Sequence, residues 1–249
     1  VQTCALPISI DDILIALNEK RERISVLNDY DSYLQKLEQQ LAKKEKELAQ
    51  ISDEVSEIRQ KSAVKLVSEI KSALNDLNFL DVQFDMQFDR LPDYTANGID
   101  APEFLISTNP GEPLKPLGKV ASGGELSRIM LGIKTIMAEN DHIESLIFDE
   151  IDSGISGRTA QMVSEKMNEL GRNHQIICIT HLPQIAAMAD AHFLIEKAVE
   201  NKSTVSRIRR LTDNDSVAEL ARMLGGAKIT DTVMESAREM KALAMEKKI

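Results

Sequence analysis

A long seam of apolar residues runs through the first third of this 249-residue chain and limits what it can fold into. The seam positions from 34 to 58 follow one another at steps of three and four: Leu34, Leu37, Leu41, Lys44, Leu48, Ile51, Val55 and Ile58. This spacing predicts a helix that pairs with a second helix along heptads. A helix of about 65 residues would be about 100 Å long, too long for one small domain to cover. We therefore predict a coiled-coil arm over residues 10–78, with residues 1–9 as an unassigned leader.

The seam has one break in its register. Its early part joins the later part by two successive steps of three, from Ile24 to Leu27 to Tyr30. Two such steps disturb the heptad repeat as a stammer does. The chain contains no second heptad run, so the partner helix of the arm is expected in another segment of the protein.

The segment ASGGELSRIMLGIK starts a second apolar series at helical spacing. Ser122 is the expected N-cap of this helix, and Glu125 is its capping-box partner. Gly123 and Gly124 would let backbone N–H groups approach an anion, and the positive end of the helix dipole favours a phosphate there. A capped helix behind a glycine turn explains the same residues without a ligand, so both interpretations stay open.

Two adjacent acids, Asp149 and Glu150, follow the apolar run Ser145 to Phe148. A buried strand that ends in two neighbouring carboxylates needs something to offset their repulsion and desolvation. Mg²⁺ with nucleotide phosphates would do so, with one acid on the metal and the other on the hydrolytic water. The alternative is a strand that runs into an acidic turn.

Beyond the arm, apolar spacing alternates between strand and helix periods. Val82, Phe84, Met86 and Phe88 alternate with polar residues, which predicts a strand buried on one face. Further strands are predicted at 104–107, 175–180, 192–197 and 204–211, and helices at 158–170, 216–224 and 230–247. This order predicts a three-layer α/β head over residues 79–249.

A histidine follows one of these predicted strands directly, at position 181. The C-terminal end of a buried strand is where α/β folds place ligand contacts, so His181 is a candidate site residue. His142, His174 and His192 have no comparable setting and are predicted to be structural.

Three segments carry a family resemblance. ASGGELSRIMLGIK resembles the signature motif of the structural-maintenance-of-chromosomes (SMC) group of ABC-type ATPases, which have coiled-coil arms. LIFDEIDSGISG resembles their Walker B strand and D-loop, and ITHLPQIAAMAD resembles their histidine switch. NPGEPLKPLGKVASGGELSR and ELARMLGG are similar to bacterial DNA-repair members of the group. The resemblance implies an α/β fold, the C-terminal lobe of an ABC/SMC-type ATPase head with a long N-terminal coiled-coil helix.

The resemblance also implies roles for the acids and the histidine, with ATP and Mg²⁺ as cofactors. Asp149 would hold Mg²⁺ through water, and Glu150 would be the general base for the hydrolytic water. His181 would contact the γ-phosphate.

The remaining matches imply a homodimer with ATP sandwiched between two heads. Ser122, Gly123, Gly124 and Glu125 would complete the ATP site of the opposite subunit. Asp152 would be the D-loop acid at the dimer seam.

The chain has no G-x-x-x-x-G-K-[ST] phosphate loop. Before Lys119, Pro113 stands where the first glycine should be, and Val120 stands where Ser or Thr should be. In the family this loop lies in the N-terminal half of the head. The chain also starts at Val1 and has its first methionine at Met86. We therefore expect a C-terminal fragment that is inactive alone and pairs with the N-terminal half of the same protein.

Composition narrows the possible partners. The net charge of −10 argues against a broadly basic DNA-coating surface, so DNA contacts are expected in local patches or in the absent half. The densest basic cluster, Arg207, Arg209 and Arg210, is expected to be a solvated sheet face.

Two cysteines, Cys4 and Cys178, cannot form a disulfide framework. The sequence shows neither a run of 18 apolar residues nor a signal peptide, which predicts a cytoplasmic protein without a membrane span.

The motifs and the resemblance together imply an ATP-hydrolysing, SMC-like protein of the bacterial nucleoid, with ADP and phosphate as products. A role in DNA double-strand break repair and recombination is implied by the resemblance alone. One alternative is another chromosome-organising or transporter head, although a transporter head would lack the arm. The other is a structural DNA tether whose ATPase site has decayed, against which the intact Glu150 and signature segment argue.

Overall fold

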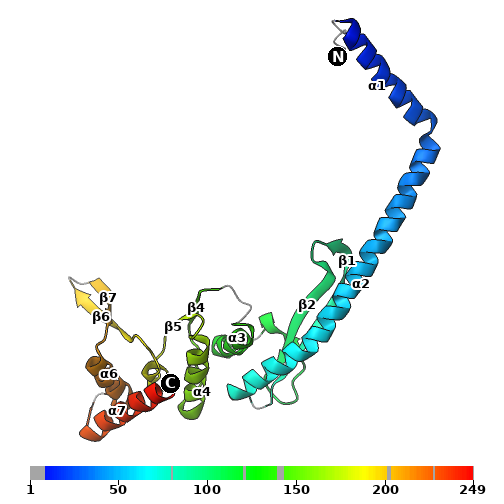
Figure 1. Ribbon diagram of the computed structural model, residues 1–249. Coiled ribbons are helices and arrows are strands. Elements are labelled where there is room, and N and C mark those ends of the chain that lie inside the picture. The colour runs from blue at the N-terminus through cyan, green and yellow to red at the C-terminus, as the bar shows by residue number, and fades with distance from the viewer. Residues whose placement is uncertain are drawn as a thin grey trace. The chain divides into compact units, whose positions relative to one another are not determined.

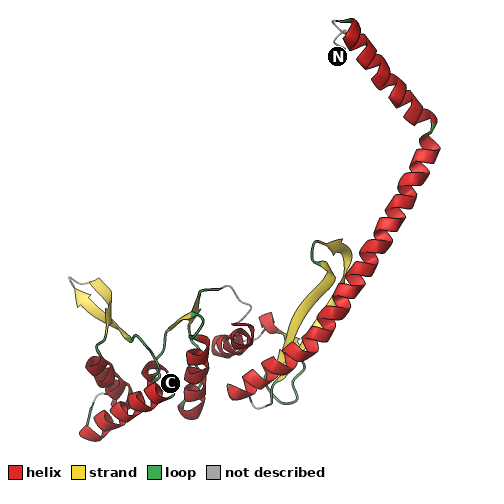
Figure 2. Ribbon diagram, in the orientation of Figure 1, coloured by secondary structure: helices red, strands yellow, loops and turns green. Residues whose placement is uncertain are grey.

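The computed structural model describes residues 9–79, 81–119, 122–138, 143–200, 203–226 and 228–248. The predicted leader up to residue 8, with Cys4, and the predicted structural His142 lie outside the described residues. Figure 1 labels the elements along the chain, and Figure 2 distinguishes helices from strands.

The predicted arm is helical and consists of two helices, α1 (Ile10–Asn28) and α2 (Tyr30–Asp76). A capping box starts α1, because Ser9 Oγ accepts from the N–H of Asp12 while the Asp12 carboxylate accepts from the N–H of Ser9. The helices meet at Asp29, whose φ of −110° and ψ of 22° are not helical (Figure 1). This break falls where the sequence changes its heptad register.

The seam of the arm is exposed. Leu41 is 59% exposed, Ile51 59% and Ile58 65%. Leucine and isoleucine at such spacing on one face of a helix are typical of a coiled-coil partner surface.

The described chain divides into two compact units. One contains the chain up to Arg59 together with Leu91–Ile99, and the other contains Gln60–Arg90 and Asp100 onward. In the first unit Ser52 and Ile99 are buried. The sequence-based boundary at residues 78/79 stays a prediction, because α2 and the first two strands contribute residues to both units.

Strands β1 (Gln83–Thr95), β2 (Gly98–Ser107) and β3 (Lys115–Pro116) form a three-stranded sheet in that order. Strand β2 pairs antiparallel with β3, with Leu105 opposite Pro116. The predicted alternation is present, since Phe84 is buried and Met86 and Phe88 are half-buried between exposed neighbours. Both long strands extend further than predicted, β1 through the mostly exposed residues 89–95 and β2 from Gly98 through the segment before Phe104.

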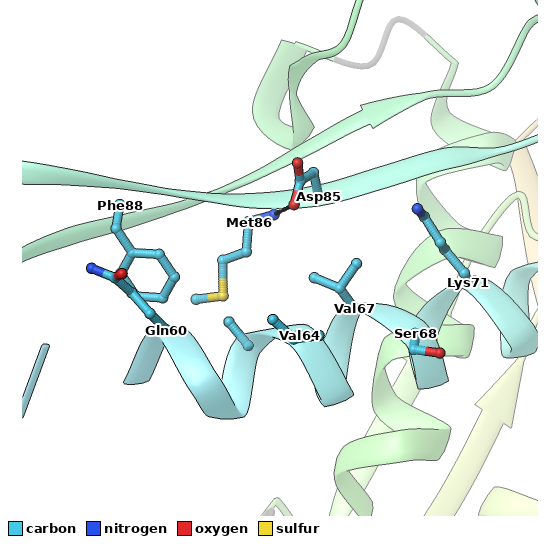
Figure 3. Close-up of a pocket in the computed structure, with 9 residues that line it drawn as sticks. Gln60, Val64, Val67, Ser68, Lys71, Asp85, Met86 and Phe88 are labelled. Carbon is cyan, nitrogen blue, oxygen red and sulfur yellow. Dashed lines mark hydrogen bonds between the residues drawn. The ribbon is translucent and has the colours of Figure 1, made fainter. Parts of the chain in front are cut away.

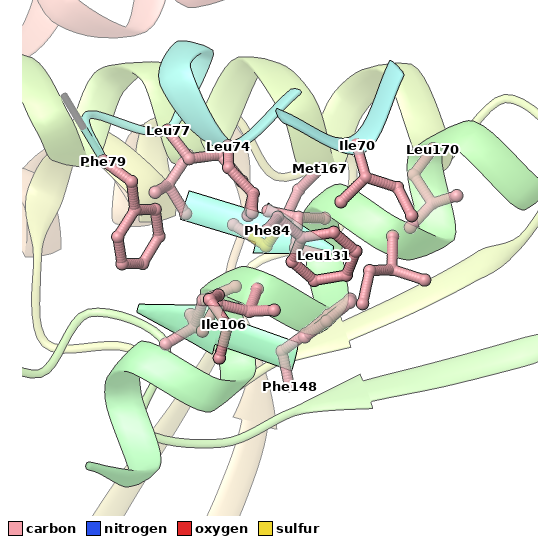
Figure 4. Packing of buried hydrophobic residues seen from close by; sticks show 14 of the residues in the cluster. Ile70, Leu74, Leu77, Phe79, Phe84, Ile106, Leu131, Phe148, Met167 and Leu170 are labelled. Atoms are coloured by element: carbon pink, nitrogen blue, oxygen red, sulfur yellow. The ribbon is translucent and has the colours of Figure 1, made fainter. Parts of the chain in front are cut away.

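The main core lies in the second unit, between the last turns of α2 and helix α3 (Gly123–Met137). Figure 4 shows its side chains gathered around Leu131 and Phe84. Fully buried members include Ile70, Leu74, Leu77, Phe84, Ile129, Leu131, Ile151 and Leu170. The helices approach closely at Gly132, where an added Cβ would lie 3.1 Å from Leu74 Cδ2 and 3.4 Å from Leu77 Cδ1.

Strands β4 (Ser145–Phe148) and β5 (Gln175–Cys178) form a parallel pair in which Ser145 lies opposite Gln175. Helix α4 (Gly157–Leu170) connects them, and α5 (Pro183–Ala187) follows β5. One face of the pair packs on the main core through Leu146, Phe148, Ile176 and Cys178. On the other face Ile147 is 70% exposed and Ile177 46%.

The last part of the chain has its own small core. Strands β6 (Phe193–Glu200) and β7 (Ser203–Arg210) form an antiparallel pair, with Ile195 opposite Ile208. Helices α6 (Asp213–Gly225) and α7 (Asp231–Glu246) follow it. These helices pack with α5 through small residues, among them Ala186, Ala221 and Ala237.

The strands of the described chain thus form three separate sheets of three, two and two strands. The described strands of the predicted α/β head therefore belong to three sheets and not to one continuous sheet. Parallel strands are normally covered on both faces, and here one face of β4–β5 has no cover from the described residues.

We expect Gly132→Val to destabilise the fold by about 1–3 kcal/mol, because its side chain would overpack the contact between α3 and α2. Urea unfolding measures the difference. Met137→Val is the matched control, since it places valine at an exposed position of the same helix. Equal stability of the two variants would contradict the close approach at Gly132.

Candidate functional site

Helix α3 begins at the predicted N-cap. Ser122 has extended backbone angles, and its Oγ accepts from the N–H of Glu125 at 3.4 Å. This is the first half of the predicted capping box. The first turn of α3 therefore begins at the predicted signature residues.

The two signature glycines lie against the loop after β4. A Cβ at Gly123 would lie 2.7 Å from Glu150 Oε2. A Cβ at Gly124 would lie 2.9 Å from the carbonyl oxygen of Glu150 and 2.9 Å from Ser153 Cβ. Real Cβ atoms do not approach other atoms so closely, and the backbone of the loop opposes Gly124, so this position needs glycine for the helix and the loop to meet. Opposite Gly123 lies only the end of the flexible Glu150 side chain, which could move aside.

Asp149 and Glu150 lie at the start of this loop, and both are exposed. The Glu150 N–H donates to Asp149 Oδ1 at 2.9 Å, and Ser127 Oγ donates to the Asp149 carbonyl oxygen at 3.0 Å. The sequence predicted that the two carboxylates are desolvated, and among the described residues they are not.

Glu150 has an unusual backbone. Its φ is 57°, in the left-handed region that residues other than glycine rarely adopt. Such a conformation costs about 1–3 kcal/mol and persists only where the surroundings enforce it. The packing of Gly124 against the carbonyl group of this residue provides that constraint.

The same loop contacts the predicted histidine. Asp152 is 4% exposed, and its Oδ2 accepts from Thr180 Oγ1 at 2.6 Å and from the N–H of His181 at 2.8 Å. The ring atom His181 Nδ1 lies 3.0 Å from the same oxygen. The structure therefore joins Asp152 to His181 within one chain, and the predicted place of Asp152 at a dimer seam stays a prediction.

Burial and the nearby acids affect Cys178, at the end of β5. Burial raises the pKa of its thiol to about 12, with smaller contributions from Asp152 and Asp149. The thiol therefore stays protonated at neutral pH and packs as a small apolar group, as the sequence predicted.

Arg128 belongs to the site and was missed from the sequence. It is 7% exposed, and its Nη1 donates to the carbonyl oxygens of Ile151 at 3.3 Å and Ser153 at 2.9 Å. Its guanidinium also lies 5.6 Å from the centre of the Phe79 ring. Burial lowers the pKa of Arg128, and Glu125 partly offsets this effect. The sequence feature that could have revealed this role is the position of Arg128 next to the apolar face of α3.

Two further histidines have structural settings, as predicted. His174 Nδ1 lies 2.6 Å from the Ile143 carbonyl oxygen, and His192 Nδ1 lies 2.9 Å from Ser216 Oγ. Burial lowers the pKa of His192, with a further contribution from Lys241 that Glu219 opposes.

Two cavities are lined by none of the predicted signature, acidic-loop or histidine-loop residues. A groove of about 610 Å³ separates α2 from β1, and Figure 3 shows Met86 and Phe88 pointing from the strand toward the helix. A polar pocket of about 270 Å³ is lined by residues that include His192, Ser216 and Lys241. Lys241 donates to the carbonyl oxygens of Ala187 and Ala189 and so ties α7 to the end of α5.

No cluster of three or more His, Cys, Asp or Glu side chains in the described part of the chain could hold a metal ion by itself. A Mg²⁺ ion commonly binds one or two carboxylates and takes its other ligands from water and phosphates. The exposed Asp149 fits that kind of binding.

Similarity to known proteins decides the family. No protein-family model matches the chain. The DNA repair protein RecN of Bacillus subtilis (strain 168) is 41% identical over 247 residues, which cover 93% of this chain and 43% of that protein. The DNA repair protein RecN of Mycobacterium tuberculosis (strain ATCC 25618 / H37Rv) is 35% identical over 93% of this chain and 42% of that protein. The chain belongs to the RecN family.

These RecN proteins are more than twice as long as the matched region, so the chain spans less than half of their length. The match is consistent with their C-terminal part. Among solved structures, the Smc head domain with a coiled coil and joint from Pyrococcus yayanosii has a TM-score of 0.54 at 19% identity, over 86% of this chain and 39% of that one. The predicted fold, an SMC-type ATPase head lobe with a long N-terminal helix, is confirmed. No described helix has the length and apolar character needed to cross a membrane.

We expect Arg128→Met to destabilise the protein by about 1–3 kcal/mol, because the carbonyl groups of Ile151 and Ser153 would lose a buried charged donor. Thermal or urea unfolding measures the loss. The matched control is Arg158→Met, which makes the same substitution at an exposed arginine near the start of α4. Equal effects at the two positions would contradict the role assigned to Arg128.

Proposed function

We propose that this chain supplies the signature, Walker B, D-loop and histidine-loop parts of an ATPase head that acts in repair of DNA double-strand breaks and recombination. The reaction is ATP plus water to ADP plus phosphate. One observation carries the proposal: the loop with Asp149, Glu150 and Asp152 contacts both the signature turn and His181. The repair role rests on the name of the relatives, DNA repair protein RecN.

Each side chain then has a chemical task. Asp149 holds Mg²⁺ through water, since a hard cation takes oxygen ligands. Glu150 accepts a proton from the hydrolytic water, for which its exposed carboxylate is accessible. His181, whose side chain is 73% exposed, contacts the γ-phosphate.

A second lobe must supply the phosphate loop, because the chain contains none. The relatives have the length for such a lobe, since this chain covers only 43% of the Bacillus subtilis protein. The open face of β4–β5, with Ile147, Ile177 and Ile179, is the surface that we assign to it. Covering this face would complete a parallel sheet that is buried on both sides.

The arm and the dimer complete the proposal. The exposed seam of α1 and α2 pairs with a second helix of the same protein, and two heads enclose ATP as a homodimer. With a net charge of −10, this chain contributes local DNA contacts at most. We place the protein in the bacterial cytoplasm, at the nucleoid.

The alternative from another functional class is a structural DNA tether without turnover. The two proposals differ at Glu150, because a tether has no use for a general base. Another chromosome-organising head remains the alternative within the ATPase class.

We expect Glu150→Gln in the assembled head to reduce ATP hydrolysis by about 10²- to 10⁴-fold while ATP binding is kept. The amide keeps the shape of the side chain but cannot take up the proton, so an ATP-bound dimer should accumulate. Steady-state phosphate release and nucleotide binding are the measurements. Glu144→Gln, which neutralises an exposed acid just before β4, is the matched control. Wild-type turnover in Glu150→Gln would remove this residue from the base role.

We further expect Ser122→Arg to block hydrolysis by placing a bulky cation where the γ-phosphate of the opposite subunit docks. Ser122→Ala is the control for the lost helix cap alone, which costs about 0.5–2 kcal/mol. Mixing Ser122→Arg with a phosphate-loop variant should restore part of the activity, because the heterodimer keeps one intact composite site. No recovery in proven heterodimers would mean that the signature serves its own subunit or that both sites must fire together.

A further inference from the structure

Asp152 is buried next to the loop that contains His181. Its side chain is 5% exposed, whereas that of His181 is 73% exposed. A single oxygen, Oδ2, receives the Thr180 hydroxyl at 2.6 Å and the His181 N–H at 2.8 Å. The backbone of the histidine is therefore anchored to the same carboxylate that its ring approaches.

The ring contact restricts where the imidazole proton can be. His181 Nδ1 lies 3.0 Å from Asp152 Oδ2, close enough for electrostatics to decide the tautomer. An unprotonated Nδ1 would bring its lone pair against a carboxylate oxygen, which is repulsive. A protonated Nδ1 is attracted to that oxygen, and the largely buried carboxylate gains a further donor.

We propose that Asp152 is a positioning residue that keeps the proton of His181 on Nδ1 and leaves Nε2 as the ring nitrogen that meets the phosphate. This inference rests on the proposed function, in which His181 contacts the γ-phosphate. A phosphate oxygen accepts hydrogen bonds, so Nε2 must also carry a proton when it binds. With both ring nitrogens protonated the imidazole is positively charged. The Asp152 carboxylate faces this charge, as the aspartate that contacts the histidine of a catalytic triad does.

The same contacts connect the two sides of the site. Asp152 is two residues after Glu150, and its carboxylate accepts from Thr180 and His181 in the next loop of the sheet. A shift of the acidic loop would therefore move the histidine as well. This role lies within one chain, where Asp152 is 4% exposed, and the seam position expected from the sequence stays a prediction.

The tautomer can be measured without nucleotide, by ¹⁵N NMR of the imidazole nitrogens in the ¹⁵N-histidine-labelled 249-residue chain. His181→Gln identifies the resonances of this residue among the four histidines. We expect a protonated Nδ1 and an unprotonated Nε2 for neutral His181. A neutral ring with its proton on Nε2 in the wild-type protein would overturn the proposal without any variant.

Three variants separate the contacts. Asp152→Ala removes the acceptor, so His181 should shift toward the Nε2-protonated form. Asp152→Asn keeps an oxygen acceptor but removes the charge, so the Nδ1 proton should stay. Thr180→Val removes the hydroxyl that donates to Asp152 and accepts from the Leu182 N–H, but it keeps the Asp152 carboxylate, so it should leave the tautomer unchanged. An unchanged tautomer in a folded Asp152→Ala protein would contradict the proposal.

Turnover in the assembled head provides the second measurement. Asp152→Ala should lower kcat by about 10- to 100-fold, the range typical of a lost partner behind a ligating histidine. KM for ATP should change little, because the phosphate loop supplies most of the binding. A Thr180→Val loss as large as that of Asp152→Ala would assign the effect to loop structure and overturn the proposal. A head without any ATPase activity would refute the proposed function, while the NMR result would still test the positioning role.

Discussion

The site depends on one contact, the approach of the first turn of α3 to the loop after β4. Gly124 allows it, because an added Cβ would lie 2.9 Å from the carbonyl oxygen of Glu150 and 2.9 Å from Ser153 Cβ. Arg128, one turn later, donates to two carbonyl groups of the same loop. The packing thus explains Gly124 without a bound anion, whereas it does not by itself require glycine at position 123. In the proposed function, the acidic loop at this contact carries Asp149 and Glu150, and Asp152 joins that loop to His181.

The same helix connects that loop to the base of the arm. Gly132 brings α3 against Leu74 and Leu77 in the last turns of α2, and the guanidinium of Arg128 lies over Phe79, just after α2. Helix α3 therefore contacts the arm helix and the acidic loop through residues that have little freedom to move. Close-packed interiors transmit displacements because they contain few voids. A movement of this part of α2 would reach the signature turn directly, which is a physical route between arm and head.

Sequence periodicity predicted the elements well where one face is buried. The seam predicted the arm and its register break near Asp29, and the alternation at Phe84, Met86 and Phe88 predicted β1. The extension of β1 to Thr95 was not predictable, because its residues are mostly exposed and carry no burial pattern. The capped start of α3 followed from Ser122, but the burial of Arg128 and Asp152 did not. Their partners are backbone carbonyls and a distant loop, which no local pattern reports.

The exposure of the acids affects how the site would form. The sequence predicted Asp149 and Glu150 at the end of a buried strand, yet both are exposed here, and so is Ile147 in that strand. Burying an isoleucine side chain fully stabilises by about 1.5–3 kcal/mol, so a lobe that covers Ile147, Ile177 and Ile179 has a strong apolar driving force. The same association would exclude water around the two carboxylates and strengthen their repulsion. Their need for a divalent cation would then arise only on assembly, so closing the sheet and binding Mg²⁺ with ATP would favour each other.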